Sequence, residues 1–331
     1  MKILANKRRS AIKIIFFVLL IFLTIALAIF PEKYSLSTYN GVLLWAISVM
    51  PSLLPYFFLT ALLTKTNALS GAFYKLTPFT NKCFRLGGIS FYAFFMSVLS
   101  GYPVGSKIIS DLHEAGVISD GEASRMSILC STSGPLFIIG AVGSGMFFSK
   151  TVGLIIYVCH VLSAILTTLI LRGTFSPPLL QQHKISFNKS DNFLYEAVYS
   201  SVISVLVVGG FISVFYVISE ILTDFNLLMP LEFLIKTVLA PVSPSGSEAK
   251  AVTVGLLEFT KGCKNLSSLG INPLTVSLCC FLITFGGASV IMQSIAFLKK
   301  AKVRCLFFIA GKLIQALISF AVCYVICLIC L

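Results

Sequence analysis

Charged side chains are scarce in this sequence. Only 11% of its 331 residues are Asp, Glu, Lys or Arg, and 57% are hydrophobic. Ordinary soluble domains carry about 25% charged residues, and uncharged apolar runs of about 18 residues or more are typical of membrane spans. Five runs without charge are 86–106, 126–149, 151–171, 197–219 and 265–298. A soluble globular protein is therefore excluded.

Acidic residues are scarcer still, and the usual catalytic motifs are missing. The 25 Lys and Arg outnumber the 12 Asp and Glu, and the cations lie between apolar runs, which indicates membrane topology and not nucleic-acid binding. No H-E-x-x-H or G-x-S-x-G motif is present. The pattern of intramembrane serine proteases needs a histidine after Ser289, but His113, His160 and His183 all precede it. We predict no enzyme activity, no cofactor and no metal site.

The ten cysteines do not indicate a disulfide framework. Most lie inside apolar runs, where cysteine behaves as a small hydrophobic residue. The C-x-x-C spacing of Cys327 and Cys330 lies at the end of such a run without a second pair. We therefore favour packing over metal or redox chemistry for these thiols.

The distribution of cations predicts how the chain crosses the membrane. A basic start precedes the apolar stretch 14–30, in which Ala26-Leu-Ala28 resembles a signal-peptidase site. Because many spans follow, we favour an uncleaved first helix with a cytoplasmic N-terminus over a cleaved signal. The positive-inside rule places the lysine-rich segments 65–86 and 299–304 in the cytoplasm, so that the C-terminus lies outside.

The order of apolar and polar segments predicts four parts. These are an N-terminal membrane anchor (1–40), a first repeat (41–172), a cytoplasmic linker (173–196) and a second repeat (197–331). Pro51 and Pro55 predict a kink or an interruption in the span 41–64, because proline lacks the backbone donor of a helix. Gly209-Gly210 predicts a corresponding interruption in the second repeat.

Several shorter helices are expected between the spans. The stretch 107–115 is stopped by Gly116, and Ser119-Asp-Gly-Glu122 has capping-box spacing for a helix towards Cys130. The glycine-rich stretch around Gly140 is expected to re-enter the membrane without crossing it. The helical segments expected in the second half are 192–222, 227–240, 247–261, 271–298 and 305–331.

A short motif recurs in the two halves. Pro103-Val-Gly-Ser106 is echoed by Pro244-Ser-Gly-Ser247, and a lysine, Lys107 or Lys250, follows each tetrad within four residues. On the predicted topology the two halves run in opposite directions, as in many secondary transporters. We therefore predict an all-α polytopic transmembrane protein with two inverted repeats and re-entrant or broken helices.

Each tetrad is predicted to start a helix, with its serine as the cap. A helix N-terminus presents unpaired N–H groups and roughly half a positive charge, so two facing starts inside the membrane would bind an anion. The alternative is that each tetrad is a surface turn with its lysine in water. The tetrads contribute Gly105, Ser106, Lys107, Ser245, Gly246, Ser247 and Lys250 to the candidate substrate site.

Three further ionisable residues need an interpretation. Lys312 lies within an apolar run, where a cation faces a cavity or partner unless it reaches the interface. Glu258 is a candidate for proton coupling, but we favour a helix-surface glutamate paired with Lys261. For His160 we favour a hydrogen-bonded packing residue over a proton relay.

Four ordered motifs resemble those of the sporulation integral membrane proteins of the YlbJ type. They are LSGYPVGSK (99–107), SGPLFIIGAVG (133–143), GLLEFTKGC (255–263) and FGGASVIMQ (285–293). The resemblance covers roughly 41–331 and extends to the wider group with the nucleoside-recognition, or Gate, domain. It implies a membrane protein of endospore-forming bacteria, associated with moving dipicolinic acid across the outer forespore membrane from the mother cell. The candidate substrate site also includes Ser131, Ser133, Gly134, Gln293 and Lys312.

The predicted function is transport of a small organic anion by alternating exposure of a central site, with dipicolinate, a planar dianion, as the favoured substrate. The alternative is a non-transporting scaffold or assembly factor of a sporulation membrane complex. Expected partners are the anion and the lipid bilayer, and either a second copy of the chain or other sporulation membrane proteins. Nucleic acid is not expected.

Overall fold

The computed structural model describes residues 2–66, 73–173, 192–242 and 246–331. Within these ranges every regular element is a helix, which confirms the predicted all-α class. Four helices are long and apolar enough to cross a membrane, and two bent pairs raise the number to six if each pair is one span. Large apolar side chains remain exposed along these helices, as a lipid environment requires.

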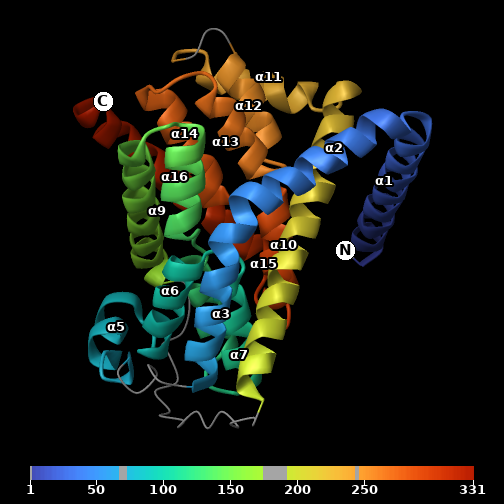
Figure 1. Ribbon diagram of the computed structural model, residues 1–331. Coiled ribbons are helices and arrows are strands. Elements are labelled where there is room, and N and C mark those ends of the chain that lie inside the picture. The colour runs from blue at the N-terminus through green and yellow to red at the C-terminus, as the bar shows by residue number, and fades with distance from the viewer. Residues whose placement is uncertain (1, 67–72, 174–191, 243–245) are drawn as a thin grey trace.

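The chain folds as long outer helices around shorter, broken ones (Figure 1). The elements of the first half are α1 (Lys2–Ile29), α2 (Pro31–Leu44), the π-helix η1 (Trp45–Val49), α3 (Met50–Thr66), α5 (Thr77–Phe84), α6 (Ile89–Ser100), α7 (Val104–Glu114), α8 (Asp120–Leu129), the π-helix η2 (Leu136–Met146), α9 (Lys150–Ile170) and a 3₁₀ turn (Leu171–Gly173). Those of the second half are α10 (Phe193–Asp224), α11 (Met229–Leu239), α12 (Ser247–Gly255), α13 (Phe259–Ser267), α14 (Pro273–Phe285), α15 (Gly287–Leu298) and α16 (Cys305–Cys330).

The helix is not interrupted at Pro51 and Pro55, and the sharp bend lies earlier, in the predicted anchor segment. The chain bends by 105° between α1 and α2, just before Pro31. From Pro31 to Thr66 the helices α2, η1 and α3 are continuous, and Pro55 lies inside α3. The wide turn η1 comes directly before Pro51, whose missing amide would leave an α-helical carbonyl without its donor. Near these prolines the helix is therefore locally widened into a π-helical turn, but it is not broken.

The predicted interruption at Gly209-Gly210 is wrong, because α10 runs unbroken through both glycines. Gly209 instead makes room for the indole of Trp45, whose Nε1 donates to the carbonyl of Val205 at 3.2 Å. Any Cβ at position 209 would overlap this ring, whereas nothing lies within 4 Å of a Cβ at Gly210. The glycine pair thus marks a close crossing of η1 and α10.

The short helices around Gly116 agree with the sequence except in one contact. Gly116 has a φ of +70° after α7, and Ser119 caps α8 by accepting a hydrogen bond from the Glu122 amide at 3.2 Å. The Glu122 carboxylate also makes a contact that the capping-box spacing does not predict. It accepts from the Gly87 amide at 2.8 Å, and so joins the start of α8 to the start of α6.

Four interruptions of the helices bring non-helical backbone into the interior. Two lie in the first half, at 101–103 between α6 and α7 and at 130–135 between α8 and η2. The other two lie in the second half, at 256–258 between α12 and α13 and at Gly286 between α14 and α15. The helix expected over 247–261 is therefore two short helices, and the run 271–298 is a broken one.

The broken pair α14–α15 is the centre of the bundle. In its most apolar stretch of 18 residues, 83% is buried inside the protein, compared with 28% for the corresponding stretch of α16 and 39% for that of α9. α14 packs against both α9 and α16, and α15 packs against α7. The interruption at Gly286 is therefore enclosed by protein and not by lipid. The four-part division and the inverted relation between the halves stay predictions.

The two cationic segments predicted to be cytoplasmic, around α5 and at 299–304, lie towards one end of the molecule, whereas Lys236, Lys250 and Lys261 lie in α11 to α13 at the other end. Lys302 Nζ is 3.9 Å from Asp120 Oδ2, and Arg172 donates to the carbonyl of Cys83 at 3.5 Å. Figure 1 shows α5 and α7 at the lower end and the C-terminus at the upper end. This arrangement is what a single cytoplasmic face for these cations requires.

A Gly209→Ala variant is expected to lose about 1–3 kcal/mol of stability, because the new methyl group overpacks the Trp45 contact. Gly210→Ala is the matched control and is expected to be neutral or to gain up to about 1 kcal/mol from helix propensity. Thermal unfolding of the purified protein in detergent measures both. Equal melting temperatures would contradict the close crossing.

Native cysteines provide a test of orientation. Cys330 is exposed at the end of α16, whereas Cys83 lies in α5 at the opposite end. In single-cysteine variants in intact cells, a membrane-impermeant maleimide is expected to label Cys330 and to miss Cys83. Permeabilised cells serve as the control for reactivity. Labelling of Cys83 from outside would overturn the predicted topology.

Candidate functional site

The four interruptions meet in the interior of the bundle. A Cβ built on Gly101 would lie 2.6 Å from the amide nitrogen of Gly134, so the two first-half interruptions touch. In the second half, the amide of Ala288 donates to the carbonyl of Leu256 at 2.8 Å, and the amide of Ser289 donates to that of Leu257 at 3.1 Å. The backbone groups freed by one interruption are thus satisfied by the next.

Lys312 reaches this meeting point from α16. Its side chain is 1% exposed, and Nζ donates to Tyr102 Oη at 2.9 Å, to the Ser131 carbonyl at 2.9 Å and to Gln315 Oε1 at 3.2 Å. Among the residues that the structure describes, no carboxylate forms an ion pair with this ammonium group. Three acceptors satisfy its donors, but they do not neutralise its charge.

Tyr102 connects the two halves. Its hydroxyl accepts from Lys312 and donates to the carbonyls of Ile283 and Thr284, each at 3.2 Å. These two carbonyls belong to the last turn of α14, just before the interruption at Gly286. A single phenol therefore bridges the α6–α7 interruption, the end of α14 and α16.

His160 makes a second bridge, which confirms its interpretation as a hydrogen-bonded buried residue. The amide of Ser133 donates to Nε2 at 2.8 Å, and Nδ1 lies 2.8 Å from Thr284 Oγ1. Because Nε2 accepts, the ring carries its proton on Nδ1 and donates it to the threonine hydroxyl. The interruption after α8 is thereby fixed to α9 and α14.

A cavity of about 30 Å³ lies where these elements meet. Its polar lining includes Tyr102, Ser133, Thr260 and Gln293, and its volume suits a single water molecule. Several buried polar atoms of the described residues near these interruptions have no hydrogen-bond partner. They are both side-chain amide atoms of Gln293, the hydroxyls of Ser131, Ser289 and Ser294, and Nε2 of Gln315. This set can bind a polar ligand.

The first tetrad lies beside this site, but not in the predicted manner. Helix α7 begins at Val104 and follows Pro103 directly, so Ser106 lies within the first turn and does not cap the helix. A Cβ on Gly105 would overlap the carbonyl oxygen of Cys130. Lys107, which is half-buried, has its charge near Asp111. The tetrad therefore packs α7 against the interruption after α8.

The expectation that the two tetrads face each other is wrong. Ser245 lies outside the described residues, and Ser247 and Lys250 are exposed. Gly246 precedes α12 with a φ of +75° and packs against the side chain of Lys236. Figure 1 shows α12 beside α11 at the upper end, with α7 at the lower end. These residues fit the surface-turn alternative.

Glu258 is not the exposed residue that we favoured. It is fully buried at the α12–α13 interruption, where its carboxylate accepts from the Thr260 amide at 3.2 Å and from Thr260 Oγ1 at 3.0 Å. Neither α12 nor α13 is among the candidate spans. Burial raises the pKa of the Glu258 carboxyl to about 7, against the opposing effect of the Thr260 hydrogen bonds.

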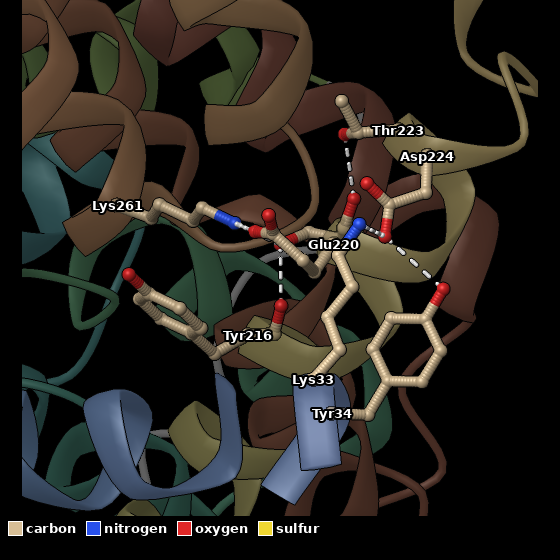
Figure 2. Close-up of polar contacts among 8 residues, drawn as sticks. Lys33, Tyr34, Tyr216, Glu220, Thr223, Asp224 and Lys261 are labelled. Atoms are coloured by element: carbon tan, nitrogen blue, oxygen red, sulfur yellow. Dashed lines mark hydrogen bonds and ion pairs between the residues drawn. The ribbon is translucent and has the colours of Figure 1, made fainter. Parts of the chain in front are cut away.

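The expected Glu258–Lys261 pair is replaced by a separate charged cluster (Figure 2). Lys261 Nζ forms an ion pair with Glu220 of α10, donates to Ser219 Oγ at 3.2 Å and lies 4.4 Å from the Tyr216 ring centre. One turn further along α10, Asp224 pairs with Lys33 at 2.7 Å and accepts from Tyr34 at 3.1 Å. α10 is thus joined to α13 and to α2.

A larger cleft of about 960 Å³ opens beside η2. Its lining comes from the α2–η1–α3 helix, from η2 and from the end of α13, and includes the single cation Lys264. Leu136 lines the cleft, and the next residue, Phe137, lines the small cavity. The Phe137 ring lies 5.4 Å from that of Phe259, which also lines the small cavity.

Sequence reasoning missed Tyr102, His160 and Thr284 as members of the site. Tyr102 directly precedes the tetrad, and its position next to Pro103 in a span was a usable signal. His160 is a lone imidazole in an apolar run, and a polar side chain there needs a buried partner. Nothing local marks Thr284, because its role depends on a contact with a residue 124 positions away.

The chain is 29% identical over 317 residues to the sporulation integral membrane protein YlbJ of Bacillus subtilis (strain 168). The alignment covers 89% of this chain and 78% of that protein. This similarity supports the YlbJ-type assignment that the four motifs indicated, and with the apolar helices it supports a multi-pass membrane protein. No family model and no solved structure matches the chain. Its relation to the wider Gate-domain group stays a prediction.

A Tyr102→Phe variant is expected to lose about 1–3 kcal/mol of stability, because the buried Lys312 ammonium group then lacks one of its three acceptors. The loss is expected to be smaller in a Lys312→Met background, with a coupling energy of about 0.5–3 kcal/mol. Tyr157→Phe is the control, since that hydroxyl makes only a 3.5 Å contact with Val98. Additive losses on thermal unfolding would contradict a stabilising Lys312–Tyr102 bond.

Proposed function

We propose that this chain, a membrane protein of the YlbJ type, transports a small organic anion during sporulation. The favoured substrate is dipicolinate, which would cross the outer forespore membrane by alternating exposure of the central site. The relative's name places that protein in sporulation and in a membrane. The resemblance to the YlbJ type supplies dipicolinate, and the site supplies the chemistry for an anion.

The observation that carries this proposal is the buried ammonium group of Lys312. An enclosed cation that no described carboxylate pairs with is costly, and in membrane proteins such a group usually serves an ion or substrate pathway. An anion bound at the meeting point of the interruptions would neutralise it. Lys312 thus replaces the two lysines of the tetrads as the principal cation of the site.

The unpartnered polar groups fit the rest of such a ligand. Dipicolinate is a planar dianion with a carboxylate on each side of a pyridine ring. The Gln293 amide and the hydroxyls of Ser131 and Ser289 can each donate a hydrogen bond to a carboxylate oxygen. The pyridine nitrogen needs one more donor, and Nε2 of Gln315, which has no partner, can supply it. The donors are therefore sufficient for both ends of the anion.

The small cavity describes a closed state, because about 30 Å³ cannot hold a pyridine dicarboxylate. Binding therefore requires the helix ends around the interruptions to separate. The cleft beside η2 supplies the approach from one side, because Leu136 of its lining is followed in the chain by Phe137, which lines the cavity and packs against Phe259. Movement of η2 or α13 would open the cavity to the cleft, as alternating access needs.

A non-transporting scaffold remains the second candidate. Its support is the wide exposed apolar surface of the outer helices, which can pack against partner membrane proteins as well as against lipid. A scaffold does not need the polar interior, so substitutions there that preserve folding would leave its function intact. The two candidates therefore differ at Lys312 and Gln293.

Uptake of labelled dipicolinate into proteoliposomes that contain only this protein tests the proposal. Lys312→Met and Gln293→Leu are expected to reduce uptake about tenfold or more, because hydrogen bonds to a charged ligand contribute about 1.5–3 kcal/mol each. Lys250→Ala is the matched control and is expected to transport normally, since that lysine is exposed. Lack of uptake by the unmodified protein would refute transport.

Spores provide the corresponding test in cells. Strains that carry Lys312→Met at normal protein level are expected to contain little dipicolinate, whereas the Lys250→Ala strain is expected to be normal. Full dipicolinate content in the Lys312→Met strain would favour the scaffold.

A further inference from the structure

Glu258 lies at the one interruption where a carboxylate faces the interior. Both of its carboxylate oxygens are directed at Thr260, which lines the central cavity together with Phe259. The side chain is fully buried, and the start of α13 is fixed by its bonds to the Thr260 amide and hydroxyl. The carboxylate is thus one residue away from the cavity lining and holds part of it in place.

The charged and titratable groups around Glu258 leave it without a cation. Lys261, on α13, is the nearest positive charge, but its ammonium group forms an ion pair with Glu220 of α10 (Figure 2). Tyr216, also of α10, faces both glutamates and contributes only a phenol. A buried carboxylate without its own cation binds a proton far more readily than an exposed one.

The backbone next to Glu258 is joined to the centre of the bundle. The carbonyls of Leu256 and Leu257 accept from the amides of Ala288 and Ser289 at the start of α15. A Cβ on Gly287 would lie 2.9 Å from the carbonyl oxygen of Gly255. The backbones at the α12–α13 and α14–α15 interruptions are therefore in direct contact. A change in how Glu258 holds α13 is therefore transmitted to α15, which carries Gln293.

We propose that Glu258 is the proton-coupling residue of this transporter and that one proton travels with each anion. This inference rests on the proposed transport function. A hydronium ion transfers its proton to a carboxylate oxygen of Glu258 and leaves water. The neutral acid accepts more weakly than the carboxylate from the two donors of Thr260, so the start of α13 is held less tightly and the cavity can open. Return of the proton to water on the other side restores the bonds.

The charges of the site give the direction of the coupling. With Lys312 protonated and Glu258 ionised, the empty site is neutral, and a bound dianion leaves it with two uncompensated negative charges. Protonation of Glu258 reduces this excess to one. Proton and anion therefore favour each other's binding, which is the thermodynamic condition for co-transport. An antiporter would need the opposite sign.

Proteoliposomes with the membrane potential clamped at zero by potassium and valinomycin test the coupling. With an interior one pH unit more alkaline than the medium, the unmodified protein is expected to accumulate dipicolinate up to about tenfold, since one pH unit is a tenfold proton gradient. Glu258→Gln is expected to equilibrate dipicolinate without any accumulation. Glu114→Gln, which removes an exposed carboxylate of α7 outside this cluster, is expected to keep the pH-driven accumulation.

A second variant tests the same residue without removing the carboxyl group. Thr260→Val deletes the hydroxyl that stabilises the ionised form, so the midpoint of the pH profile of uptake is expected to move to higher pH. Uptake by the unmodified protein without any response to the pH gradient would overturn the coupling alone. So would pH-driven accumulation by Glu258→Gln. Absence of uptake at every pH would overturn the transport function and the coupling with it.

Discussion

The structure depends on one constraint: backbone groups that a helix interruption frees inside a membrane must find partners within the protein. In this chain the interruptions satisfy one another. Leu256 and Leu257 accept from Ala288 and Ser289, and the Ser133 amide reaches the imidazole of His160. None of these segments can keep its conformation alone. The conformations of the four interruptions therefore depend on one another. The site that they enclose is built from both halves of the chain.

Lys312 adds charge to this site. Its donors are all used by Tyr102, Ser131 and Gln315, so a bound anion would have to displace at least one of these acceptors. Displacing Tyr102 would release the contact with α14, and displacing Ser131 would release the segment after α8. Binding of an anion and rearrangement of the interruptions are thus linked by the same hydrogen bonds. A cation with spare donors would lack this link.

The sequence was sufficient for the parts that depend on local chemistry. Charge-free runs predicted the spans, Gly116 and Ser119 predicted the ends of α7 and α8, and an isolated cation in an apolar run predicted the importance of Lys312. The sequence was not sufficient where the partner of a side chain is set by contacts between residues far apart in the chain. Spacing suggested a partner for Glu258 three residues away, but Lys261 pairs with Glu220, which is 41 positions from it. No local pattern could have revealed that.

The error over the tetrads has a physical origin in the two uses of glycine. In Pro103-Val-Gly-Ser106, the glycine lets α7 cross the carbonyl of Cys130, a contact that any side chain would obstruct. In the second tetrad, the buried Gly246 supplies a left-handed residue just before α12. The two tetrads therefore share a glycine for different reasons. Gly105 is needed because there is no space for a side chain, and Gly246 is needed because the backbone has a positive φ. The true counterpart of Gly105 in packing is Gly287, where backbone again meets backbone. Gly101, which lines the central cavity, makes the same kind of contact with the amide of Gly134, so opening of the cavity there must separate backbone segments that touch directly.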